Sequence, residues 1–195
     1  MKLIFASHNE NKTAEIRQLL PAGIELLSLN DLNFQEEIKE TSDTLEGNSA
    51  LKAAYIYSIF KLPCFADDSG LEVAFLQNRP GVYSARYAGE PKNDDNNMNK
   101  LLEDLKGIQQ RKAQFRTVIT LMLESATFSF EGIIKGEITE QKIGENGFGY
   151  DPIFRPIGEV KTFAQMTMKE KNSRSHRALA LEKMISFLSL GKFSN

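Results

Sequence analysis

The sequence has little cysteine, no long apolar run and no excess of either charge. Its one cysteine, Cys64, cannot form an internal disulfide and stands in an apolar segment, so we expect a small core residue rather than a nucleophile or a metal ligand. No apolar run approaches the ~20 residues of a membrane-spanning helix, and the first residues lead into a strand rather than a signal peptide. These absences predict a cytoplasmic protein that does not bind a membrane.

Charge is nearly balanced, with 24 basic and 26 acidic residues and a formal charge of −2. The lack of a long basic run argues against a broad nucleic-acid surface, whereas a small phosphorylated ligand needs only a few local cations. Histidines and cysteines form no cluster that would indicate zinc. With 41% hydrophobic residues, the chain suits one folding unit, residues 1–195, that buries a full core.

Strand-like and helix-like segments alternate along the first half of the chain, which is typical of an α/β protein. We expect strands at 2–6, 24–28, 63–67 and 71–76, and helices at 9–20, 43–61 and about 93–106. The second helix carries a capping-box pair at its start, Asp43 with Glu46. Two later β-rich runs, 113–123 and 127–138, are predicted to form a hairpin that makes the sheet mixed.

Two adjacent acids, Asp67 and Asp68, end a short apolar strand and are followed by Ser69-Gly70, which predicts a turn. Carboxylates delivered by a strand end are where a magnesium-and-phosphate site is built in an α/β protein, provided that basic residues lie elsewhere to meet the phosphates. Neighbouring strand residues point to opposite faces, so we do not expect the two aspartates to do the same job.

Two predicted helices carry basic residues in their first turns. Asn9 is the expected N-cap of one helix, with Lys12 in its first turn, and Ser175 is the expected cap of a second, followed by His176 and Arg177. Cations near a helix N-terminus are disfavoured by about 0.3 to 1 kcal/mol each. Exposed charges can bear that cost in solvent. Because two helices share the pattern and an acidic strand accompanies them, a bound polyphosphate is the simplest compensation.

The loop 144–152 places three glycines around two aromatic residues and an acid. Glycines let a backbone approach a ligand closely, and an aromatic ring between them can stack on a base. The same pattern is equally typical of a tight turn whose aromatic side chains fill the core. The loop alone leaves both interpretations open.

Together these segments resemble one family, the inosine triphosphate pyrophosphatases, which hydrolyse non-standard purine nucleoside triphosphates. Each short string is weak evidence, but seven of them in order along nearly the whole chain are strong. They are Ser7-x-Asn9-x-x-Lys12, Glu40-Thr41, Glu46-Gly47-Asn48 with Lys52-Ala53, Ala66-Asp67-Asp68-Ser69-Gly70, Gly81-x-Tyr83-Ser84-Ala85-Arg86-Tyr87, Gly147-Phe148-Gly149-Tyr150-Asp151-Pro152, and Lys171 with Ser175-His176-Arg177.

The resemblance implies an α/β fold with an elongated central mixed sheet flanked by helices, and two lobes with a nucleotide cleft between them. It also implies a homodimer and a requirement for Mg²⁺. The implied reaction is attack of water on the α-phosphorus of ITP, dITP or XTP, which gives the nucleoside monophosphate and pyrophosphate and cleanses the nucleotide pool.

The resemblance also assigns roles to the chemistry-bearing residues. Asp68 is the implied general base and a metal ligand, and Glu40 is the second metal ligand, although Glu40 alone would pass for an ordinary surface acid. Asn48 and Lys52 lie four residues apart and share one helix face. The implied triphosphate-binding residues are Ser7, Asn9, Lys12, Lys52 and Ser69.

The base-binding side of the family corresponds to a second group. Hypoxanthine and xanthine carry a carbonyl at C6 where adenine carries an amino group, so donors aimed at that oxygen reject adenine. Asp67 is expected to position its loop, and Arg86 to be a cleft residue or a side chain at a lobe interface. The implied base-binding residues are Phe148, Gly149, Tyr150, Asp151, Lys171, His176 and Arg177.

Two other functions remain open at this point. A related nucleotide pyrophosphatase of the same broad fold would prefer other altered nucleotides, and the Ser-His-Arg and Phe-Gly-Tyr-Asp strings argue against it. A nucleotide-binding regulator without catalysis would leave Asp68 and Glu40 idle. Release of pyrophosphate from the preferred nucleotide separates these functions.

Overall fold

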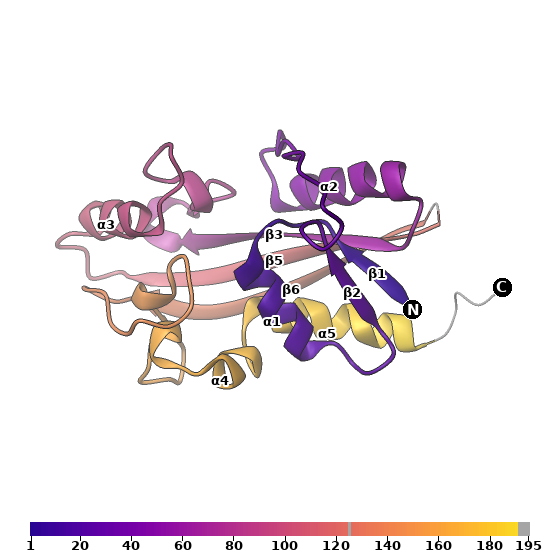
Figure 1. Cartoon of the computed structure of the whole chain (residues 1–195). Coiled ribbons are helices and arrows are strands. Elements are labelled where there is room, and N and C mark those ends of the chain that lie inside the picture. Colours follow the sequence, from indigo (N-terminus) through magenta and orange to yellow (C-terminus); the bar gives the residue numbers. More distant parts are fainter. Residues whose placement is uncertain (125, 191–195) are drawn as a thin grey trace. The chain divides into compact units, whose positions relative to one another are not determined.

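The computed structural model describes residues 1–124 and 126–190 (Figure 1). It is a mixed α/β protein, as predicted, with a central sheet flanked by helices. Within these residues, no helix is both long and apolar enough to cross a membrane. The strands and α-helices are β1 (Lys2–Phe5), α1 (Glu10–Leu19), β2 (Glu25–Ser28), α2 (Leu45–Phe60), β3 (Cys64–Val73), β4 (Arg79–Gly81), α3 (Asp94–Asp104), β5 (Lys112–Leu123), β6 (Ala126–Ile138), β7 (Phe154–Pro156), α4 (Met168–Asn172) and α5 (His176–Ser189).

The sheet is mixed, as predicted, and the turn of the predicted hairpin includes residue 125, which lies outside the described residues. Its strands follow the order β2-β1-β3-β5-β6-β7, and β4 pairs with β3. β1 runs parallel to both β2 and β3, whereas β3–β4 and β6–β7 are antiparallel. Parallel strands joined through helices at the start of the chain and antiparallel strands later agree with the alternation read from the sequence.

The chain divides into two compact units, and each is described by itself. Unit 1 comprises Met1–Asp68, Thr117–Gly132 and the segment from Arg177, and unit 2 comprises Ser69–Arg116 and Ile133–His176. Each unit therefore collects segments that are far apart in the sequence. The expectation that residues 1–195 form a single domain stays a prediction.

In unit 1, the strands are covered by helices on both faces (Figure 1). Leu3, Phe5 and Phe65 pack with α1 and α5 on one face. On the other face, Ile4 and Cys64 pack with α2. This alternation follows from the two-residue period of a strand. Cys64 is fully buried, and burial raises the pKa of its thiol to about 12, which confirms it as a core residue rather than a nucleophile.

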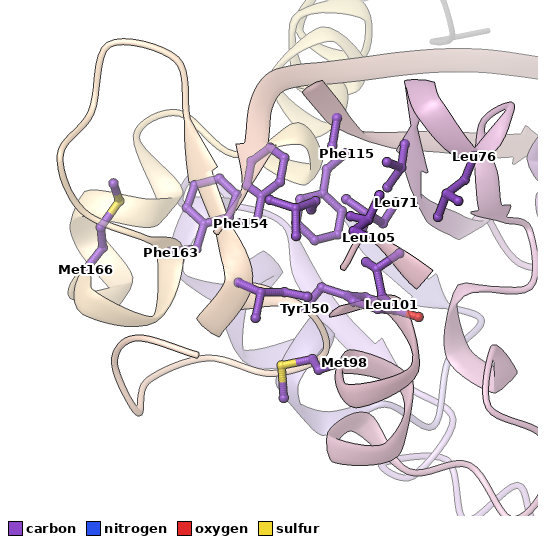
Figure 2. Close-up of a cluster of buried hydrophobic side chains, with 14 residues drawn as sticks. Leu71, Leu76, Met98, Leu101, Leu105, Phe115, Tyr150, Phe154, Phe163 and Met166 are labelled. Carbon is purple, nitrogen blue, oxygen red and sulfur yellow. The ribbon is translucent and has the colours of Figure 1, made fainter. Parts of the chain in front are cut away.

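Unit 2 has its own hydrophobic core, shown in Figure 2. Phe115 of β5 and Phe154 of β7 lie with their ring centroids 4.6 Å apart. Leu101, from α3, and Tyr150 belong to the same cluster. Tyr150 comes from the glycine-rich loop, so that loop is tied to the packed interior of unit 2.

Two local predictions are wrong. The segments predicted as separate strands at 63–67 and 71–76 form one strand, β3, which continues through Ser69 and Gly70 and ends at Val73. The backbone of β4 passes so close to position 70 that only glycine fits there. A Cβ at Gly70 would lie 2.5 Å from the Gly81 carbonyl oxygen in β4. Helix α2 is capped by Thr44, whose side chain accepts from the Gly47 amide, rather than by Asp43.

Candidate active site

The two aspartates of β3 lie just beyond the end of the neighbouring strand β1. β1 pairs with β3 at Ile4↔Cys64 and Phe5↔Phe65, and the Ala6 amide still donates to the Phe65 carbonyl at 2.8 Å. After that point the chain leaves the sheet and enters α1. Asp67 and Asp68 therefore lie at the carboxyl end of a parallel strand pair, which is where open α/β sheets bind ligands.

Asp67 faces α1 and α5 and joins a buried ion-pair network. Its Oδ1 accepts from Lys12 Nζ at 2.9 Å, and its Oδ2 accepts from Arg177 Nε at 3.0 Å. Arg177 also donates to Glu15 of α1. Asp67, Arg177 and Glu15 are almost fully buried, so each charge depends on its partners.

Asp68 faces α2 and has different neighbours. Asn48 Nδ2 donates to Asp68 Oδ2 at 3.2 Å, and Lys52 Nζ lies 3.7 Å from Asp68 Oδ1. Lys52 also donates to Glu40, whose segment precedes α2. Asn48 and Lys52 share one face of α2, as predicted. Asp67 and Asp68 thus point to opposite faces, as predicted, and their different roles stay a prediction.

The surroundings of the two aspartates shift their pKa values in opposite directions. For Asp67, burial favours the neutral form, but Lys12 and Arg177 outweigh it and hold the pKa well below its usual range. For Asp68, burial raises the pKa, and Lys52 opposes this without reversing it. Asp67 is thus a fixed anion of the structure, and Asp68 is a carboxylate with greater affinity for a proton.

The two groups act on each other electrostatically. Burial lowers the pKa of Lys12 despite Asp67, and the charges of Arg177 and Lys52 lower it further. For Lys52, burial is outweighed by Asp68 and Glu40, which raise its pKa. Lys12 and Lys52 thus belong to one charged centre, although they approach β3 from opposite faces. Separate cations that repel each other beside carboxylates can receive a polyanion.

The first turn of α1 is built by the residues predicted for it. Asn9 is the N-cap, its Oδ1 accepting from the Lys12 amide at 3.1 Å, and Ser7 Oγ accepts from the Asn9 amide at 3.1 Å. Lys12 and Arg177 do lie in the first turns of α1 and α5. Both side chains pair with Asp67, so an internal carboxylate already compensates these cations. The helix-start pattern by itself therefore does not require a polyphosphate.

Glu40 and Asp68 are the two carboxylates that the resemblance implies as magnesium ligands. Both carboxylates lie within 3.7 Å of Lys52 Nζ, so the two acids border the same cation. Carboxylate oxygens are the ligands that Mg²⁺ prefers, and one or two of them with substrate phosphates and water complete its shell. Among residues 1–124 and 126–190, no group of three or more His, Cys, Asp or Glu side chains is placed to hold a metal alone. The donor set fits a metal that is shared with a phosphate.

In unit 2, the glycine-rich loop is organised around Asp151. Its Oδ2 accepts from Lys171 Nζ at 2.6 Å and from the Phe148 amide at 3.0 Å. Gly147 has a φ of 78°, and a Cβ there would lie 2.1 Å from Asp151 Oδ2. Only glycine fits that position.

Two aromatic rings lie beside the ion pair of Lys171 and Asp151. Lys171 Nζ lies 4.7 Å from the centre of the Phe148 ring and 5.6 Å from that of Phe163. Tyr150 is buried and donates from its hydroxyl to the Ser84 carbonyl at 2.8 Å. The two interpretations of the loop thus divide between its aromatic residues: Tyr150 fills the core, while Phe148 is only half-buried.

The remaining predicted residues occupy defined positions. His176 is buried in unit 2 and stacks on Phe115, with ring centroids 4.6 Å apart and planes 10° apart. Ser69 is half-buried within β3. Arg86 is half-buried, with its guanidinium 5.8 Å from the Tyr83 ring. The structure brings the predicted residues together in three groups: Lys12, Asp67 and Arg177; Glu40, Lys52 and Asp68; and Phe148, Asp151 and Lys171.

Sequence reasoning missed two residues of these surroundings. Glu15 pairs with Arg177, 162 positions further along the chain. Its signal is weak: an acid beside Ile16, three positions after Lys12 on the buried side of α1. Asp94 accepts from the Gly149 amide at 2.7 Å, and it lies in a stretch that carries no recognisable motif.

This chain is similar to known proteins along nearly its whole length. The family model described as the Ham1 family matches residues 3–187. A dITP/XTP pyrophosphatase of Flavobacterium johnsoniae is 56% identical over 192 residues, which cover 98% of this chain and all of that protein. A dITP/XTP pyrophosphatase of Bacillus subtilis is 46% identical over 189 residues, which cover 95% of this chain and 96% of that protein.

A solved structure has the same fold. The Staphylococcus aureus Ham1 protein superposes with a TM-score of 0.89 at 39% identity, covering 98% of this chain and all of that chain. The matched length includes segments of both units.

Proposed function

This chain belongs to the Ham1 family, and from that membership we propose that it hydrolyses non-standard purine nucleoside triphosphates, namely dITP, ITP and XTP, to the monophosphate and pyrophosphate. The observation that carries the proposal is identity of 56% along the full length of a dITP/XTP pyrophosphatase. The resemblance predicted from the seven strings is confirmed by the same comparisons.

Asp68 is the proposed general base. Asn48 Nδ2 orients its carboxylate through the bond to Oδ2, so that an oxygen of Asp68 is fixed to accept a proton from water. Asp68 takes the proton of the water that attacks the α-phosphorus. The bond from that phosphorus to the bridging oxygen then breaks, and pyrophosphate leaves.

Glu40 and Asp68 would hold the Mg²⁺, because both carboxylates border Lys52 and supply the oxygen ligands that Mg²⁺ prefers. When bound, the metal would neutralise phosphate charge and favour ionised Asp68. Lys52 already contacts both acids, so it is placed to remain beside the phosphates that the metal binds. Lys12 is held by Asp67 and carries the second positive charge for the leaving pyrophosphate. Ser7, Asn9 and Ser69 are the proposed phosphate-binding polar residues.

The glycine-rich loop is the proposed base-binding element. Phe148 is half-buried beside Lys171, and its ring is available to stack on a purine. Lys171, His176 and Arg177 are the proposed donors that favour a carbonyl at C6 over the amino group of adenine. Gly149, Tyr150 and Asp151 hold the loop in shape. Action as a cytoplasmic homodimer belongs to the same proposal.

Hydrolysis in ¹⁸O-labelled water tests the proposed reaction. The purified protein is incubated with Mg²⁺ and XTP or dITP, and the masses of the products are measured by mass spectrometry. We expect one ¹⁸O in the monophosphate and none in the pyrophosphate, and no turnover when EDTA removes the metal. Release of orthophosphate and a diphosphate would show that a different bond is broken, and absence of any product would favour a regulator without catalysis.

A further inference from the structure

The amide of Gly149 donates to a carboxylate that lies outside the glycine-rich loop. The acceptor is Oδ2 of Asp94, 2.7 Å away and 55 positions earlier in the chain. Asp94 is the first residue of α3, and both residues lie in unit 2. A hydrogen bond with an ionised acceptor is stronger than one between neutral groups, so this contact, although exposed to solvent, restrains the loop.

The loop needs such a restraint at this position. Phe148 stands between Gly147, with a φ of 78°, and Gly149, with a φ of 62°. Glycines on both sides leave the backbone of Phe148 free to rotate unless contacts hold it. On the Gly147 side, the Phe148 amide donates to Asp151 at 3.0 Å. On the other side, the bond from Gly149 to Asp94 performs the same task.

Helix α3 is a rigid support for Asp94. Asn97 is almost fully buried, where it accepts from the Ala88 amide at 2.7 Å and donates to the Ala85 carbonyl at 3.0 Å. Met98 and Leu101 anchor the helix in the core of unit 2. A carboxylate at a helix N-terminus is also favoured by the helix dipole. The acceptor for Gly149 is therefore fixed in position and charged.

We propose that Asp94 is a positioning residue of the base-binding loop, which sets the orientation of the Phe148 ring by holding the Gly149 amide. This inference rests on the proposed function. The general base and the phosphate-binding cations lie in unit 1, away from this bond in the chain. Loss of the bond therefore weakens base binding and leaves the chemical step largely intact.

Steady-state kinetics of Asp94→Ala test the role, with Asp95→Ala as the matched control. Asp95 lies in the same helical turn and pairs with Lys142, so its loss removes the same charge from the helix start but keeps the Gly149 acceptor. For XTP we expect Asp94→Ala to raise KM about tenfold with kcat within about twofold of the wild type. Asp94→Asn keeps an acceptor oxygen and should restore most of the affinity.

Amide hydrogen exchange gives a readout that needs no nucleotide. Exchange at the Gly149 amide should accelerate in Asp94→Ala and stay at the wild-type rate in Asp95→Ala. Equal changes in the exchange rate of the Gly149 amide in both variants would overturn this inference alone. So would an unchanged KM of Asp94→Ala for XTP, provided that the wild-type protein hydrolyses XTP. A wild-type protein that released pyrophosphate from no nucleoside triphosphate would instead overturn the proposed function.

Discussion

Two neighbouring aspartates on one strand have opposite environments, and this difference separates structure from chemistry. Asp67 is ionised between Lys12 and Arg177, whereas Asp68 sits where burial favours its protonated form. A strand places consecutive side chains on opposite faces, so one dipeptide serves both the ion-pair network of α1 and α5 and the polar face of α2.

Amide substitution of each aspartate should separate these roles. Asp67→Asn leaves Lys12 and Arg177 without their shared anion, so we expect the free energy of unfolding to fall by about 3 kcal/mol. Asp68→Asn should change stability by less than about 1 kcal/mol, because Asp68 already carries an unfavourable buried charge. It should lower kcat by about a hundredfold or more through loss of the base. Urea unfolding and pyrophosphate release measure both effects; equal destabilisation by the two changes would contradict this assignment.

Two glycines of one loop form a second matched pair. Gly147 and Gly149 both have left-handed backbones, and an alanine there costs about 1 to 2 kcal/mol. A Cβ at Gly147 also collides with Asp151 Oδ2 at 2.1 Å, whereas nothing lies within 4 Å of one at Gly149.

We therefore expect Gly147→Ala to lower Tm more and to raise KM for XTP more than Gly149→Ala, because only the former displaces Asp151 from Lys171. Thermal melts and initial-rate kinetics on the two variants make the comparison. A Gly149→Ala protein that is equally impaired would show that backbone strain alone, and not the position of Asp151, controls the loop.

Some of the contacts of individual residues could be predicted from the sequence, and others could not. Asn9, Lys12 and the Asn48–Lys52 face were predictable because their patterns are local. Glu15 and Asp94 were not, since each finds its partner in a segment that is distant in the sequence.

At the scale of elements, N-terminal caps determine where the helices that carry site residues begin. α4 carries Lys171 and starts with a capping box, in which Thr167 accepts from the Glu170 amide and Glu170 accepts from the Thr167 amide at 2.7 Å. Hydrogen bonds from the Thr167 backbone, then Lys161, lower the pKa of Glu170 from 4.5 to about 2.

This lowered pKa predicts a defined pH dependence of stability. Because the folded pKa lies below the unfolded one, the unfolded state binds more protons between them, and stability is gained as pH rises from about 2 to 4.5. Glu170→Gln keeps the cap but removes the titration, so urea unfolding should show a shallower loss of stability on acidification than in the wild type. Parallel pH profiles for the two proteins would contradict the role of the carboxylate.

Periodicity predicted the longer helices and strands, with ends within a few residues, but not the short elements β4, β7 and α4. It failed at β3, where Ser69-Gly70 has the composition of a turn. The reason for Gly70 lies in the approach of the Gly81 carbonyl from β4, which no local pattern contains. It also failed at the cap of α2, where Asp43 and Thr44 are both good capping residues and the backbone selects the second.

At the scale of the whole molecule, the fold and the family were predictable because the motifs occur in order along the chain. The resemblance implied two lobes, but the segments that make up each compact unit were not predicted, because each unit is assembled from separate segments that no composition shift separates. The metal ligands and base-binding residues stay predictions, and the groups in which the structure places them are the reason for testing them together.

The most direct test of the account compares ITP with ATP. Pyrophosphate release with Mg²⁺ gives kcat/KM for each nucleotide under the same conditions. We predict that ITP exceeds ATP by at least about a hundredfold, because donors aimed at the C6 carbonyl are left unpaired by the adenine amino group. Equal values for the two nucleotides would contradict the proposed discrimination of the base.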